Sequence, residues 1–180
     1  MINIFVGRVG TGKTYSLVRL ALHKIMKEKQ DVYSNFYIDF SPYEKVKNEY
    51  NKYLHYWERV NDFVKIKRGI ILIDEAQIYF NSRNWSALPP RVQYKFQQHR
   101  KHGLDIYGAV QNVKRVDTII RELVNRVYQI KKVGRLFIVN QYDIEDIDRA
   151  KRKSIWTSAY FLNKKLADCY DTYAEIQPDL

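Results

Sequence analysis

The stretch at residues 7–14, "GRVGTGKT", decides the fold of this 180-residue chain. Gly7, Gly12, Lys13 and Thr14 occupy every fixed position of the phosphate-binding loop G-x-x-x-x-G-K-[ST]. A polyphosphate must be wrapped by backbone N–H groups, and glycine permits an approach that a larger side chain would block. Lys13 can then reach the β- and γ-phosphates, while the Thr14 hydroxyl binds the accompanying Mg²⁺. The expected ATP-binding residues are Gly7, Arg8, Val9, Gly10, Thr11, Gly12, Lys13, Thr14 and Tyr15.

The sequence around the loop supplies the context that the motif requires. Residues 2–6, "INIFV", form a short β-prone run, and residues 15–29, "YSLVRLALHKIMKEK", carry apolar side chains at helical spacing. A strand, a loop and a helix in this order place the phosphates at a helix N-terminus, where the dipole favours anions. This context argues against the alternative, a glycine-rich turn that binds nothing. We expect the loop and Lys13 to be exposed.

Composition points to an ordinary globular protein. With 46% hydrophobic residues, residues 1–180 can bury a full core as a single domain. Cys169 is the only cysteine, which excludes an internal disulfide and favours a reducing cytoplasm. No apolar run approaches the ~20 residues of a membrane-spanning helix, and the N-terminus does not resemble a signal peptide. We expect a cytoplasmic protein.

The net charge of +11 is unevenly distributed along the chain. Residues 91–135 contain eleven Lys and Arg against three acids, a local charge of +8. A basic surface raises the affinity for phosphate backbones irrespective of base sequence. This region therefore predicts contact with DNA, without sequence specificity, or with an anionic membrane. The alternatives are a solvated face and arginines reserved for the nucleotide.

A second chemical motif occurs at residues 69–77, "GIILIDEAQ". The apolar run is typical of a buried parallel strand, and Asp74 and Glu75 follow at its carboxyl end, where ligands bind in open α/β sheets. We expect Asp74 to hold Mg²⁺, through water, and Glu75 to orient and deprotonate an attacking water. An apolar run followed by two acids is often just a strand end, but the phosphate-binding loop makes this pattern specific.

The segment between the two motifs, residues 43–60, "YEKVKNEYNKYLHYWERV", is rich in tyrosine and lysine. Tyr50, Tyr53, Leu54 and Trp57 follow the i, i+3, i+4, i+7 spacing of a helix face that packs on the core. Aromatic rings interspersed with cations also stack on bases or lie at a membrane interface. We favour core packing.

A third segment, residues 98–112, "QHRKHGLDIYGAVQN", contains a predicted strand at 106–110. Gly103 is a plausible helix C-cap, and Gln111 ends the strand, level with Asp74 if the strands are parallel. An amide there can contact the γ-phosphate or the attacking water. His99 and His102 raise the possibility of a second metal, but no cysteine or acid cluster completes the pair. We therefore expect Mg²⁺ alone.

Together these segments resemble the zonular occludens toxin-like (Zot) family, which includes the filamentous-phage assembly ATPases and belongs with the FtsK–HerA group of DNA-pumping ATPases. The resemblance rests on "GRVGTGKT", "IILIDEAQIYF", "NSR", "QHRKHGLDIYGAVQNVKRVDTIIRELVNRV" and "KKLADCYDTYAEI". It implies an additional-strand, RecA-like ATPase core in a homo-oligomeric ring, with Glu75 as catalytic base and Gln111 as sensor. It also implies an arginine that acts across a subunit interface, Arg100, with Arg121 and Arg126 as alternatives. Typical phage assembly members continue into a membrane-spanning helix and a periplasmic domain, which these 180 residues do not contain.

The expected fold is a three-layer α/β P-loop NTPase with a mostly parallel sheet. Gly134, between two β-prone runs, predicts an antiparallel hairpin at one edge, and the acidic "DIEDID" at 143–148, before the basic "RAKRK", predicts a surface segment. The expected strands lie near residues 2–6, 31–36, 70–73, 106–110 and 126–132.

Two functions follow from these motifs. The first is an ATP-driven motor that translocates, packages or exports viral DNA, with viral or membrane-associated assembly partners. The second is a P-loop phosphotransferase for nucleosides or nucleotides, which would need an acceptor pocket and a lid. Glu75 directly after Asp74 suits activation of water better than transfer to a hydroxyl. A nucleotide-dependent binding protein with little turnover is a weaker third option.

Overall fold

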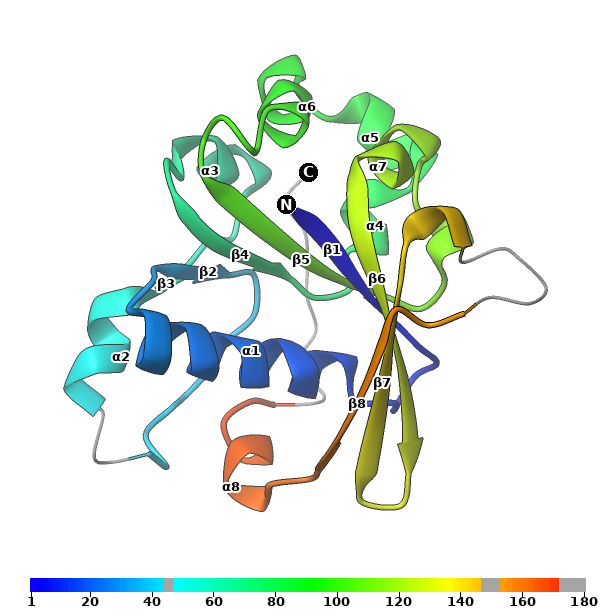
Figure 1. Cartoon of the computed structure of the whole chain (residues 1–180). Coiled ribbons are helices and arrows are strands. Elements are labelled where there is room, and N and C mark those ends of the chain that lie inside the picture. Colours follow the sequence, from blue (N-terminus) through cyan, green and yellow to red (C-terminus); the bar gives the residue numbers. More distant parts are fainter. Residues whose placement is uncertain (44–46, 147–152, 172–180) are drawn as a thin grey trace.

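The computed structural model describes residues 1–43, 47–146 and 153–171. An eight-stranded sheet forms its centre, in the order β3-β2-β4-β5-β1-β6-β7-β8 (Figure 1). The strands from β3 to β6 in this order pair in parallel, and β7 and β8 are antiparallel. The strands are β1 (Ile2–Val6), β2 (Val32–Ser34), β3 (Leu54–Tyr56), β4 (Gly69–Ile73), β5 (Leu104–Val110), β6 (Val124–Val133), β7 (Leu136–Tyr142) and β8 (Trp156–Phe161).

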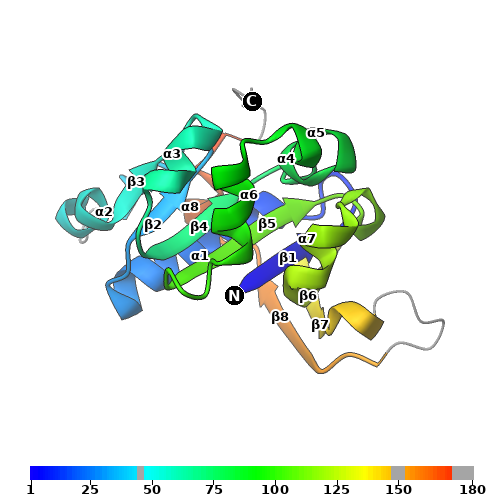
Figure 2. The ribbon, with the colours of Figure 1, turned by 90° about the horizontal axis from the view of Figure 1, so that it is seen from above.

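Helices cover both faces of this sheet (Figures 1 and 2). Successive residues of β4 pack to opposite sides, Ile71 and Ile73 on one and Ile70 and Leu72 on the other, which explains its unbroken apolar run. One face carries α1 (Lys13–Glu28), α2 (Lys47–Tyr53) and α8 (Lys164–Ala167). The other carries α3 (Val60–Lys65), α4 (Gln77–Phe80), α5 (Ser82–Ala87), α6 (Pro90–Gln97), the short 3₁₀ turn η2 (Val113–Arg115) and α7 (Thr118–Leu123).

The predicted three-layer fold and edge hairpin are confirmed. β1 has the predicted bounds, β4, β5 and β6 cover the predicted segments, and β6 pairs with β7 in antiparallel register. Gly134 lies at the tip of this hairpin with φ 58°, a left-handed conformation that favours glycine. Among the described helices, none combines the length and the apolar composition needed to cross a bilayer.

The helix predicted from the spacing of Tyr50 to Trp57 is wrong in its second half. α2 ends at Tyr53, and Leu54 begins β3, which pairs with β2 at the sheet edge. Tyr50 and Trp57 are buried, as core packing requires, but they lie in the two cores on opposite faces of the sheet. Backbone hydrogen bonds to β2 stabilise residues 54–56 as a strand more than the helical spacing of the apolar residues stabilises a helix.

Three further boundaries differ from the sequence-based expectations. The strand predicted at 31–36 is limited to Val32–Ser34, and β8 was not predicted. Gly103 does not cap a helix: α6 ends at Gln97, and Gly103 is a turn residue with φ 59° immediately before β5. The 3₁₀ turn η3 (Ile144–Asp146) follows β7, and the rest of the acidic segment and most of "RAKRK" lie outside the described residues.

Candidate active site

The glycine-rich loop joins the end of β1 to the start of α1. Gly10 and Gly12 have φ of 75° and 90°, left-handed conformations that glycine adopts without steric cost. The Arg8 carbonyl accepts hydrogen bonds from the Thr11 hydroxyl at 2.7 Å and from Lys13 Nζ at 3.2 Å. Lys13 is only 6% exposed, so the expectation of a surface lysine is wrong: it packs beneath the loop. Val9, at the tip, is 79% exposed.

The loop is backed by the hairpin. A Cβ on Gly12 would lie 2.2 Å from the Phe137 ring of β7, so glycine is required there for space as well as for conformation. Phe137 stacks on Tyr15, with ring centroids 4.9 Å apart. Tyr15 is buried, and its hydroxyl accepts a hydrogen bond from the Asn163 backbone N–H at 2.9 Å. The Tyr15 side chain therefore belongs to the core, and its backbone alone faces the predicted phosphate site.

Asp74 lies against the loop. Its Oδ2 accepts a hydrogen bond from the Thr14 hydroxyl at 2.7 Å, and its Oδ1 accepts one from the Glu75 backbone N–H at 3.0 Å. Burial raises the pKa of Asp74, and these two hydrogen bonds oppose the shift. The fold thus joins a hydroxyl and a carboxylate that are 60 residues apart in sequence. Such hard oxygen donors fit Mg²⁺.

Asn35, which the sequence analysis missed, fixes the backbone of Asp74. Its Oδ1 accepts from the Asp74 N–H at 2.7 Å, and its Nδ2 donates to the Asp74 carbonyl at 3.1 Å. Asn35 directly follows β2, the parallel neighbour of β4, so both residues reach the same edge of the sheet. The sequence contained a signal for Asn35: it is an amide residue directly after a strand, the same feature by which Gln111 was predicted.

Glu75 has a backbone that non-glycine residues seldom adopt. Its φ is 47°, in the left-handed region, and its carboxylate accepts a hydrogen bond from the Gln77 side chain. This conformation turns the chain sharply after Asp74, and the Ala76 N–H then donates to the Ala109 carbonyl at 2.8 Å. The left-handed turn sets Glu75 at the carboxyl edge of the sheet, next to the metal-ligand candidates.

Gln111 follows β5 at this same edge. β4 and β5 are parallel, with Ile73 opposite Gly108. Gln111 lines a pocket of about 680 Å³ together with Gly7, Arg8 and Thr11. The pocket thus joins Gln111 to the loop, and separate hydrogen bonds join Asp74 to Thr14 and to the Glu75 backbone; Thr14, Asp74 and Glu75 are not among the residues that line this pocket. The described residues that line this pocket include four cations and no acid; the cations are Arg8, Lys114, Lys131 and Lys132.

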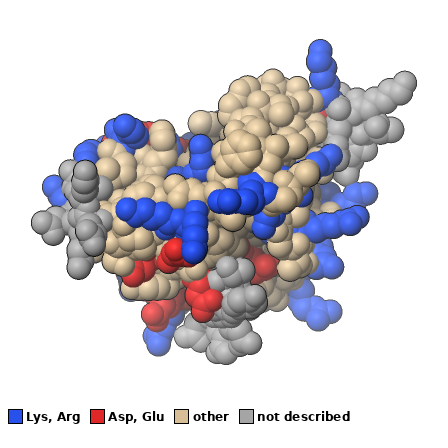
Figure 3. All heavy atoms as spheres, turned by 90° about the horizontal axis from the view of Figure 1, so that it is seen from below, with Lys and Arg blue, Asp and Glu red and all other residues tan. Residues whose placement is uncertain are grey.

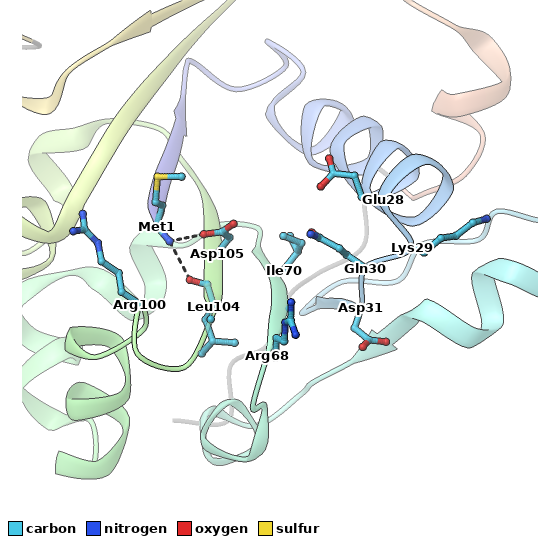
Figure 4. A pocket seen from close by; sticks show the side chains of 12 residues that line it. Met1, Glu28, Lys29, Gln30, Asp31, Arg68, Ile70, Arg100, Leu104 and Asp105 are labelled. Carbon is cyan, nitrogen blue, oxygen red and sulfur yellow. Dashed lines mark hydrogen bonds and ion pairs between the residues drawn. The ribbon is translucent and has the colours of Figure 1, made fainter.

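Arg100 lies at the opposite edge. It is exposed in the turn between α6 and β5, beside a pocket of about 720 Å³ (Figure 4). The N-terminal amine of Met1 donates there to the Leu104 carbonyl at 3.0 Å and pairs with Asp105. The seven residues of β5, about 20 Å of extended chain, separate this pocket from Gln111. Arg100 therefore cannot reach the loop of its own chain.

The two alternative arginines are engaged locally. Arg121, in α7, donates to the Thr118 hydroxyl at 3.2 Å. Arg126, in β6, pairs with Asp143 next to the end of β7. Both arginines thus have partners within the chain, whereas an arginine that acts on a neighbouring subunit needs a guanidinium that is free to reach it.

The basic region at 91–135 is divided among several surfaces. Lys95 is buried, and its Nζ donates to the Val64 carbonyl at 3.0 Å. α6 and the tip of the β6–β7 hairpin, which both carry cations, lie at opposite ends of the molecule (Figure 1). On the face with α1, α8 and the hairpin, Lys and Arg side chains form a row across the middle (Figure 3). The local charge of +8 is therefore not a single patch.

Comparison with known proteins places the chain in a family. The N-terminal domain of zonular occludens toxin from Neisseria meningitidis is similar in structure, with a TM-score of 0.59, 23% identity, and coverage of 94% of this chain and 98% of that one. The genome packaging NTPase B204 from Sulfolobus turreted icosahedral virus 2, solved with ATP-gammaS, has a TM-score of 0.57 and 14% identity, with coverage of 86% and 98%.

These likenesses show the P-loop NTPase fold. The Gene 1 protein of Enterobacteria phage I2-2 is 35% identical over 75 residues, which are 40% of this chain but 20% of that protein. The chain thus matches about a fifth of the length of this relative. The model of the family described as "Zonular occludens toxin (Zot)" matches residues 1–177. The chain belongs to the Zot family.

Proposed function

We propose that this protein is a Mg²⁺-dependent ATPase. The observation that carries the proposal is the hydrogen bond between Thr14, in the glycine-rich loop, and the buried carboxylate of Asp74, which is followed directly by Glu75. Phosphoryl transfer to water needs a phosphate cradle, a metal site and a base, and the three lie at one edge of the sheet. The likeness to the packaging NTPase, whose structure was solved with an ATP analogue, supports this assignment.

Each residue has a defined role in this proposal. The backbone N–H groups of residues 7–15 and Lys13 hold the phosphates. Thr14 and Asp74 hold Mg²⁺, which neutralises phosphate charge when bound. Glu75 orients a water and accepts its proton, and Gln111 contacts the γ-phosphate or that water. Asn35 and Gln77 position Asp74 and Glu75.

We further propose that hydrolysis drives the movement of viral DNA during translocation, packaging or export. The likeness in fold to a packaging NTPase supports this role, and so does the net charge of +11, which favours contact with phosphate backbones. The chain would work as one domain in a homo-oligomeric ring, on the cytoplasmic side, alone or with membrane-associated assembly partners. Arg100 would complete the ATP site of the neighbouring subunit, because it is exposed and remote from its own.

The test is the rate of ATP hydrolysis with and without single- and double-stranded DNA, run beside an assay for phosphate transfer to nucleosides. Stimulation by DNA, without transfer, is the expected result. DNA binding should weaken steeply with salt and show little sequence preference, since it depends on phosphate contacts. Transfer to a nucleoside, or a flat salt response, would favour a phosphotransferase instead.

A further inference from the structure

A groove lies between α1 and the antiparallel side of the sheet, on the face opposite α4–α7. α1 packs across β5. Between α1 and the neighbouring strands β6, β7 and β8 there is a hollow of about 700 Å³. We call this hollow the aromatic groove, because seven Phe, Tyr and Trp side chains line it: Phe5, Tyr43, Tyr50, Tyr107, Tyr128, Tyr160 and Trp156. None of these residues belongs to the ATP site.

The rings range from the buried Phe5 and Tyr50 to the exposed Trp156. Phe5 lies at the floor, with Tyr107 stacked beside it at 6.3 Å and Tyr128 at 5.2 Å between ring centroids. Tyr107 and Tyr128 are half-buried, and Trp156 on β8 is 55% exposed.

A row of basic side chains borders the rings. Arg19, His23 and Lys27 are exposed on α1 at i, i+4 and i+8, so they form one line along about 12 Å of helix. Arg19 and Lys27 are the two cations of this line, and His23 between them lies 3.6 Å from the Glu28 carboxylate. The Arg19 guanidinium lies 4.3 Å from the centroid of the Tyr160 ring, which holds it flat at the rim. Among the described residues that line the groove there is no Asp or Glu. The groove therefore combines aromatic surfaces with a positive border.

We propose that the aromatic groove binds single-stranded DNA, with bases stacked on its rings and phosphates paired with the α1 cations. The inference rests on the proposed action on DNA and names the form of DNA that this surface holds. Unpaired bases expose faces that can stack on Trp and Tyr, whereas a duplex buries those faces between its own base pairs. Arg19 and Lys27, about two helical turns apart on α1, can pair with the phosphates of a strand that lies beside the stacked bases.

Tryptophan emission provides a direct test. The chain has three tryptophans, and Trp57 and Trp85 are 4% and 2% exposed, so Trp156 is the one that a ligand can reach. Titration with oligo(dT) should quench this emission, because a stacked base contacts the indole. A duplex hairpin of the same strand length should leave it unchanged. In Trp156→Phe the quenching should disappear while binding, followed by anisotropy of labelled oligo(dT), is retained.

Affinity measurements compare two alanine variants of β8, one inside the groove and one outside it. Trp156→Ala should weaken oligo(dT) binding roughly 5- to 100-fold, the effect of one lost stack. Phe161 is 74% exposed on β8 but points to the other face, and Phe161→Ala should change affinity by no more than about twofold. Arg19→Gln and Lys27→Gln should each reduce the slope of log affinity against log salt by about 0.7.

Several results would overturn the inference. If Trp156→Ala and Phe161→Ala change the affinity for oligo(dT) equally, or if single strands and duplex bind equally well, bases do not stack on the groove. Displacement of oligo(dT) by self-association or by anionic vesicles would assign the groove to a second copy or to a membrane. If DNA stimulates ATP hydrolysis in the wild type and in Trp156→Ala alike, the groove assignment fails while the motor stands. If DNA neither binds nor stimulates, the proposed DNA role fails as well.

Discussion

The two ends of the central strands differ in chemistry and in environment. At the carboxyl ends of β1 and β4, Thr14 and Asp74 are joined by a short hydrogen bond, and Asp74 is 7% exposed. At the amino ends, Arg100 is exposed, and the Met1–Asp105 ion pair has side chains that are 65% and 37% exposed. The first edge joins the loop and the carboxylate by contacts within one chain. The second carries the cation that, in our proposal, completes the site of a neighbouring subunit.

The largest effect should come from the loop itself. Lys13→Ala should abolish ATP turnover, because it removes the cation that we expect to contact the β- and γ-phosphates. Lys13 also bonds to the Arg8 carbonyl, so thermal melting should accompany the kinetic assay. Lys24→Ala, in the same helix but paired with Glu28, is the control and should retain activity. Equal turnover of Lys13→Ala and the wild type at saturating Mg²⁺ would refute the phosphate site.

The next effect tests the opposite edge. An arginine inserted into a phosphoryl-transfer site contributes about 10³–10⁵ in rate, so Arg100→Ala should lower turnover by that factor while Lys101→Ala does not. Turnover per subunit should rise with protein concentration as rings form. Mixing Arg100→Ala with Glu75→Gln should restore some activity, because mixed rings contain interfaces with both intact residues. Concentration-independent turnover without such rescue would mean that Arg100 does not act in trans.

Glu75→Gln should cause the next largest fall in the rate of hydrolysis. The amide keeps the shape of the side chain but cannot accept a proton, so hydrolysis should fall by about 10²–10⁴ while ATP still binds. Binding of a fluorescent ATP analogue and single-turnover hydrolysis separate the two quantities. Weakened binding with an unchanged rate per bound ATP would instead make Glu75 structural or a metal ligand.

The smallest effect concerns pH. Burial raises the pKa of Asp74, so this carboxylate gains a proton at a higher pH than an exposed aspartate does. Mg²⁺ requires the deprotonated form, so the Mg²⁺-dependent part of ATP binding is complete above this pKa and is lost as the pH falls through it. Below it the affinity should drop about tenfold per pH unit. Asp74→Asn should bind ATP weakly with little response to Mg²⁺ or pH; a wild type with the same flat profile would contradict the role.

The sequence predicted the parts of the molecule that local patterns specify. The glycine spacing of the loop and the apolar run before Asp74 each lie within a few residues, and the structure has both where they were expected. Contacts between distant segments were missed. Phe137 behind Gly12 and Asn35 beside Asp74 depend on which strands become neighbours.

Competition between local and tertiary preferences explains the other differences. Helical spacing from Tyr50 to Trp57 gave way to the β3–β2 ladder, since a free sheet edge offers hydrogen bonds that the pattern does not contain. Counting charges in residues 91–135 gave their number but not their location, because strand β6 and helix α6 carry them to different ends of the molecule. Trp156, on an unpredicted strand, was not singled out at all.

If Glu75 is the catalytic base that we propose, its backbone conformation sets thermal stability against turnover. A side chain in the left-handed region costs about 1–2 kcal/mol, a cost that glycine does not carry. Glu75→Gly should therefore raise the free energy of unfolding by about 1 kcal/mol while removing the proton acceptor. A screen of variants for melting temperature alone would therefore select a substitution that, under the proposed mechanism, abolishes ATP hydrolysis.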